Sequence, residues 1–111
     1  MRLAHSGVNI HGLDIRMRNV IKTAAVFFNE VKEELVITSA RDGIHSPGSY
    51  HYYGYAVDIR TRHLSSEEKI EFELFMKAGL SSYYDVVLHK THLHVEFDVD
   101  RFERNFSKKG D

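Results

Sequence analysis

Apolar side chains recur every three or four residues between about Asp14 and Glu33. This spacing places them on one face of an α-helix. A second helical segment is expected to begin at Ser65, because Ser65 and Glu68 have the spacing of a capping box, and to end near Gly79. The pattern therefore predicts two main helices with one buried face each. The apolar residues of the first are Met17, Val20, Ile21, Ala24, Phe27, Phe28 and Val31.

Alternation of apolar and polar residues predicts strands over 55–60 and 92–97, and short apolar runs predict two more over 35–38 and 84–88. Turn dipeptides predict a loop over 39–53. Helices and strands follow one another without a regular βαβ alternation. We therefore expect an α+β fold with a small, largely antiparallel sheet and two main helices.

The chain of 111 residues is expected to form a single domain over residues 1–111 and to be a monomer, with a charged tail over 100–111 that frays. Fifteen basic residues against sixteen acidic ones argue against nucleic acid as the main partner. No apolar run is long enough to insert into a membrane, and the first residues lack the pattern of a signal peptide. We therefore expect synthesis in the cytoplasm.

Eight histidines and no cysteine mean that a tight transition-metal site would use imidazole and carboxylate ligands. His92, His94 and Glu96 alternate with apolar residues, so all three are expected on one face of their strand. A His-x-His pattern alone is weak support for a metal site, and a polar, solvated strand face explains it as well.

Asp58 is a carboxylate on a strand that is expected to be central, where burial without a partner is costly. A metal ion would explain it, and a salt bridge to Arg41 or Arg60 would also explain it. If His51, Asp58 and His94 converge, they form a zinc site with three ligands and a fourth position for water. Such a site is more often catalytic than structural.

Three segments together resemble the D-Ala-D-Ala peptidase family of zinc enzymes, which shares its fold with the Hedgehog signalling domain. They are the run Ile37-Thr38-Ser39-Ala40-Arg41, the pattern Ser-x-His-x-x-Gly-x-Ala-x-Asp over 49–58, and His-x-His over 92–94. The resemblance covers residues 36–98. It is closest to the small phage or prophage members, which act on the bacterial cell wall.

The resemblance implies a zinc metallopeptidase that hydrolyses peptidoglycan stem peptides, either as a D-Ala-D-Ala carboxypeptidase or as an endolysin-type endopeptidase. It implies that Zn²⁺ is held by His51, Asp58 and His94, and that His92 stabilises the oxyanion. Arg41 would bind a substrate carboxylate, and Ser49 would contact the substrate or orient the site.

One residue departs from the family pattern. The family places an acidic general base three residues before the last zinc histidine, where this chain has Thr91. His89 is the first substitute, because a neutral imidazole has a suitable pKa, and Glu96 is the second. Thr91 also favours an alternative function, a non-catalytic zinc-binding module that binds peptide, wall fragment or protein partner. A weaker alternative is a structural domain without metal.

Overall fold

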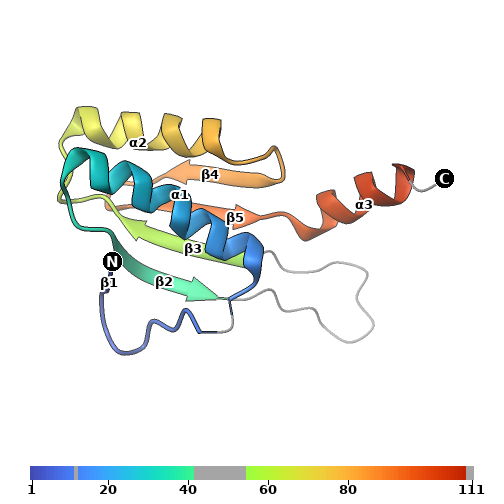
Figure 1. Cartoon of the computed structure of the whole chain (residues 1–111), viewed down its shortest axis with the longest axis horizontal. Coiled ribbons are helices and arrows are strands. Elements are labelled where there is room, and N and C mark those ends of the chain that lie inside the picture. The colour runs from blue at the N-terminus through green and yellow to red at the C-terminus, as the bar shows by residue number, and fades with distance from the viewer. Residues whose placement is uncertain (12, 42–54, 110–111) are drawn as a thin grey trace.

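The computed structural model describes residues 1–11, 13–41 and 55–109, without the side chains of Arg41 and of residues 106–109. Five strands and three helices form within these residues, so the predicted α+β class is confirmed (Figure 1). Their order along the chain is β1 (Arg2–Leu3), α1 (Ile15–Val31), β2 (Val36–Arg41), β3 (Tyr55–Arg60), α2 (Ser66–Gly79), β4 (Tyr84–Leu88), β5 (His92–Phe97) and α3 (Val99–Lys109).

The strands form one sheet in the order β1-β2-β3-β5-β4. The pairs β2–β3, β3–β5 and β4–β5 are antiparallel, as the sequence predicts, whereas β1 joins the edge of β2 in parallel and makes the sheet mixed. Strand β3 lies at the centre of the sheet, and β5 is its neighbour although 31 residues separate Arg60 from His92. This order brings the two polar motifs of the sequence side by side.

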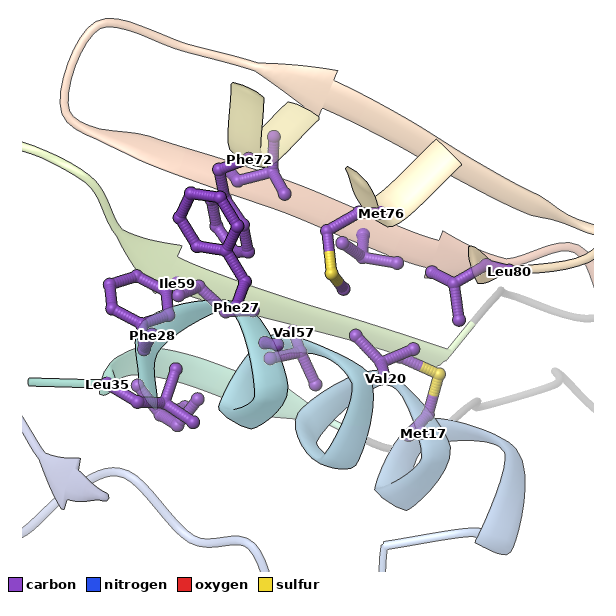
Figure 2. Packing of buried hydrophobic residues seen from close by; sticks show 14 of the residues in the cluster. Met17, Val20, Phe27, Phe28, Leu35, Val57, Ile59, Phe72, Met76 and Leu80 are labelled. Atoms are coloured by element: carbon purple, nitrogen blue, oxygen red, sulfur yellow. The ribbon is translucent and has the colours of Figure 1, made fainter. Parts of the chain in front are cut away.

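Helices α1 and α2 cover the same face of the sheet (Figure 1). Three phenylalanines join them: the ring centroids of Phe27 and Phe72 are 4.9 Å apart, and those of Phe28 and Phe72 are 5.0 Å apart. Figure 2 shows these rings with Val57 and Ile59 of β3 in the space between the helices and the sheet. The core therefore occupies one face of the sheet, and the opposite face is left for polar side chains.

The predicted capping box is confirmed at the start of α2. The Ser65 hydroxyl accepts from the Glu68 amide at 3.1 Å, and the Glu68 carboxylate accepts from the Ser65 amide at 2.9 Å. Two ends of elements differ from expectation. Strand β2 extends to Arg41, into the predicted loop, and helix α3 replaces most of the predicted tail. None of the helices in the described part of the chain is long and apolar enough to cross a membrane.

Candidate metal centre

The polar face of β3 and β5 carries the candidate site. On β5 the side chains of His92, His94 and Glu96 are half-buried and alternate with the fully buried Leu93, Val95 and Phe97. The prediction that the three polar residues share one face is therefore confirmed. Asp58 of β3 lies on the same face, because the antiparallel register pairs it directly with His94.

Asp58 and His94 make the closest contact in the site. The Nδ1 atom of His94 lies 2.6 Å from Oδ1 of Asp58, and each side chain is 25% exposed. An ionised carboxylate only accepts hydrogen bonds, so the imidazole is the donor in this pair. The predicted partners of Asp58 were a metal ion or an arginine. Within the described residues, its partner in a short contact is this imidazole rather than Arg60.

Three further side chains surround this pair. Nε2 of His92 lies 3.9 Å from Oδ1 of Asp58, and Oε1 of Glu96 lies 3.9 Å from Nε2 of His94. The exposed His89 stacks on His92 with 4.8 Å between ring centroids and lies 6.4 Å from the ring of His94. Both candidate proton carriers, His89 and Glu96, are thus next to the predicted ligands.

Thr91 lies in the turn between β4 and β5, and its exposed hydroxyl is 3.4 Å from Nδ1 of His92. The turn is closed by a hydrogen bond from the His89 amide to the His92 carbonyl at 2.8 Å, and the Thr61 amide, just after β3, donates to the Thr91 carbonyl at 3.0 Å. The position that the family fills with an acid therefore borders His92, and the hydroxyl that occupies it cannot act as a base near neutral pH.

The structure does not describe the side chains of the other three predicted site residues. His51 and Ser49 lie between residues 42 and 54, which are not among the described residues, and Arg41 is described by its backbone alone. The register pairs Arg41 with Ala56, two residues from Asp58 along β3. In the described ranges, no group of three or more His, Asp or Glu is arranged to hold a metal ion, and the third predicted ligand lies outside them.

The donor set of Asp58 and His94 fits zinc. A carboxylate oxygen and an imidazole nitrogen are ordinary zinc ligands, and both must be deprotonated to bind the ion. Two ligand atoms on a tetrahedral zinc ion with bonds of about 2.0–2.1 Å lie roughly 3.3 Å apart. The observed 2.6 Å separation is that of a hydrogen bond. A metal ion held by Asp58 and His94 would take the place of the proton that the two side chains now share.

Sequence reasoning missed a group of arginines beside this site. Arg60 shares the polar face of β3 with Asp58, and Arg62 follows just after the strand ends. Desolvation lowers the pKa of the Arg60 guanidinium below its usual value, and the positive charges of Arg62 and Arg2 lower it further. Strand alternation alone places Arg60 on this face, and the sequence pattern suggests only a salt bridge to Asp58 as its role.

Comparisons of the chain with protein-family models, with curated proteins and with solved structures return no match. The function is therefore inferred from the site itself and from the motifs of the sequence.

Proposed function

We propose that the chain is a zinc metallopeptidase that hydrolyses peptide bonds in peptidoglycan stem peptides. The observation that supports this most is the contact between His94 and Asp58, half-buried on a polar sheet face. These residues come from two motifs 36 positions apart in the chain, and both occupy ligand positions of the motifs that resemble zinc peptidases. A substrate in the cell wall would require a phage lysis route or export.

Asp58 and His94, together with His51, would hold the metal ion. When bound, zinc supplies Lewis-acid polarisation of the scissile carbonyl and lowers the pKa of a water molecule to about 7. His92 borders this position, since its Nε2 is 3.9 Å from Asp58. Its imidazole N–H can donate a hydrogen bond to the carbonyl oxygen as negative charge develops there. His92 would thus stabilise the transition state.

The proton from the attacking water needs an acceptor other than Thr91. His89 has its ring against His92, and Glu96 has a carboxylate oxygen near Nε2 of His94, so either can receive the proton and pass it to the leaving amine. Glu96 can equally orient His94 by accepting from its ring, as carboxylates beside metal-bound histidines often do.

A second candidate function is a non-catalytic zinc-binding module on the same scaffold. The observation that favours it is the hydroxyl of Thr91 at the position of the family's base. Loss of a general base typically slows such a reaction by about 10²–10⁴-fold. A module of this kind would keep the metal and use the neighbouring surface to bind a peptide, a wall fragment or a protein partner.

Zinc content and hydrolysis test the proposal together. The purified chain is expected to hold about one zinc ion and to release peptide fragments or free D-alanine from purified peptidoglycan, identified by mass. Asp58→Ala and His94→Ala should lose the metal and the activity, whereas the exposed His11 serves as a matched control through His11→Ala. Zinc far below one ion per chain, with melting unchanged by a chelator, would overturn both zinc functions.

Thr91→Asp separates the enzyme from the binding module. The new carboxylate is expected to raise kcat by about 10²-fold or more, with zinc content unchanged. Thr91→Asn is the matched control, because its amide has a similar size and cannot accept the proton. Zinc binding without hydrolysis in both variants and in the wild type would establish the binding module instead. A fall in kcat in His89→Ala but not in Glu96→Gln would assign the native base to His89.

A further inference from the structure

A second pocket lies against helix α1, away from the candidate metal centre. Its volume is about 320 Å³, and it is open to solvent. The helix that forms one of its walls covers the face of the sheet opposite to Asp58 and His94 (Figure 1). We call it the α1 pocket, and its lining residues are Ile10, His11, Leu13, Arg18, Ile21 and Lys22.

Two hydrogen-bonded segments of the chain form the walls of the α1 pocket. The three lining residues from α1 are three and four positions apart, so they share one face of the helix. The other wall is the segment before the helix. There the His11 amide donates to the Asn9 side chain at 2.9 Å, and the Leu13 amide donates to the Ile10 carbonyl at 3.3 Å. Local hydrogen bonds therefore fix the shape of both walls.

The floor of the α1 pocket is apolar and adjoins the hydrophobic core. Leu13 is 4% exposed, and the side chains of Ile10 and Ile21 are partly buried and pack against the core. A hydrocarbon group seated on these side chains would remove apolar surface from water on both partners. The floor therefore favours a ligand with an apolar body.

The charges beside this floor suit an anion. Arg18 and Lys22 are exposed, and their side chains make no hydrogen bond or ion pair with another residue in the described ranges. Four residues of helix span about 6 Å, so both cations can reach one anionic group. Asp14 is the only acidic residue between positions 10 and 22, and its carboxylate is already paired with Arg16 at 2.6 Å.

The size of the α1 pocket suits a short amphiphile. An engineered cavity of about 150 Å³ takes up benzene, which has six carbons. By the same ratio, a pocket of about 320 Å³ accommodates roughly ten non-hydrogen atoms. This is the size of a carboxylate on a saturated chain of eight carbons in total.

We propose that the α1 pocket binds a medium-chain fatty carboxylate. The hydrocarbon chain lies on Ile10, Leu13 and Ile21, and the carboxylate lies between Arg18 and Lys22. The guanidinium can bind both carboxylate oxygens, and the ammonium adds a further charge-assisted hydrogen bond. This ligand site goes beyond the proposed peptidase function and does not rest on it, because the two sites share no residue.

The first test titrates the metal-free full chain with octanoate, so that the carboxylate has no zinc ion to bind. Calorimetry should give a dissociation constant of about 1 mM or lower. Octanamide has the same body without the charge and should bind about tenfold more weakly. Acetate has the charge without the body and should show no measurable binding. Equal dissociation constants for octanoate and octanamide would overturn the proposal.

Chain length tests whether the apolar floor holds the hydrocarbon chain. Each methylene group that enters the pocket should lower the dissociation constant by about fourfold from butanoate to octanoate. Beyond about ten carbons the pocket is full, and the dissociation constant should stay level. Equal affinities for butanoate and octanoate would show that the floor does not contact the chain, and the proposal would fail.

Variants locate the ligand. Arg18→Gln and Lys22→Gln should each weaken octanoate binding by roughly tenfold and leave octanamide binding unchanged. Ile21→Ser should weaken binding of both ligands, because it makes the floor polar. Arg104→Gln is the matched control, because Arg104 is exposed on α3. If both charge variants bind octanoate as the wild type does, the carboxylate is held elsewhere and the proposal is wrong.

A final arm distinguishes a pocket for a small molecule from a basic surface that adsorbs to membranes. The chain is sedimented with vesicles of phosphatidylglycerol and phosphatidylcholine, with and without saturating octanoate. We expect it to stay in the supernatant in both cases, because a recessed floor and two cations make little contact with a flat surface. Sedimentation that is lost in Arg18→Gln and is not reduced by octanoate would assign these residues to membrane binding instead and overturn the proposal.

Discussion

Asp58 illustrates how much of the site a single residue reveals. A carboxylate on a central strand is expected to have a partner. Alternation along β3 and along β5 places Asp58 and His94 each on the polar side of its own strand. Sequence alone does not indicate that the two strands are neighbours, or that the register sets these residues directly opposite each other. Directly opposite residues have Cβ atoms roughly 5 Å apart, close enough for a hydrogen bond, and this explains why the imidazole is the partner.

Asp14 gives a prediction at the residue scale, for the dependence of stability on pH. It caps α1 by accepting from the Arg16 amide at 2.9 Å, and its carboxylate is paired with the Arg16 guanidinium at 2.6 Å and 2.9 Å. The hydrogen bonds from Arg16 hold the pKa of Asp14 below its ordinary 3.8. A lowered folded-state pKa adds stability above the ordinary value, and this contribution is lost as the pH falls through the lowered pKa.

Urea unfolding of the wild type and of Asp14→Asn should therefore converge on acidification. At about pH 7 we expect the wild type to be more stable by about 0.5–1 kcal/mol. Asparagine is also a good helix cap, so the substitution isolates the charge. Below the ordinary pKa the difference should shrink and then vanish. A difference that stays constant from neutral to acidic pH would show that the pair does not titrate with folding.

At the scale of elements, the sequence predicts most of the sheet and both helices of the core. In strands β3 and β5 apolar residues alternate with polar ones, and β4 is largely apolar. The observed first and last residues of these three strands are those that the sequence predicts. The second helix is marked by its capping box. These elements can be recognised from the local sequence because each packs one apolar side against the core. In a strand, a shift of the register by one residue would expose that whole apolar side to solvent.

The elements that were missed lack such a signal. Strand β1 has only two residues and is held by its pairing with β2, so nothing local distinguishes it. Helix α3 is mostly charged and is attached through contacts distant in the chain: the ring of Phe102 is 5.6 Å from Phe97 and 5.3 Å from Tyr83, and Arg101 donates to the Ser82 carbonyl at 2.6 Å. The end of β2 is polar and forms a strand because β3 offers it a partner. Tertiary pairing, rather than local pattern, determines all three.

A substitution at Ser65 tests how much the capping box stabilises α2. Ser65→Ala removes the hydroxyl that accepts from the Glu68 amide, and the free energy of unfolding should fall by about 1 kcal/mol. Ser66→Ala is the matched control, because Ser66 is the first residue of the helix and lies beside the cap. Thermal or urea unfolding gives both values. Equal losses in the two variants would mean that the cap adds nothing beyond helix propensity.

Over the whole molecule, the residues of the hydrophobic core and those of the candidate site lie on opposite faces of the sheet. The side chains that hold α1 and α2 to the sheet lie on one face and are almost fully buried, whereas Asp58, His92 and His94 lie on the other and stay partly exposed. A partly exposed polar group can exchange its partner for water at small cost. Substitutions in the candidate site are therefore expected to leave the fold intact.

Phe72 and His94 test this separation. Phe72 is fully buried against Phe27 and Phe28, so Phe72→Ala should lower the free energy of unfolding by about 3–5 kcal/mol, and Phe72→Leu by less. His94→Ala should lower the free energy of unfolding of the metal-free protein by only about 1 kcal/mol.

Zinc should raise the Tm of the wild type and of Phe72→Leu by similar amounts, because it is expected to bind the native state alone. It should leave the Tm of His94→Ala unchanged. Calorimetry with and without zinc measures all three. Loss of the zinc response in Phe72→Leu would mean that core and site are coupled through β3, and the two faces would then have to be treated as one unit.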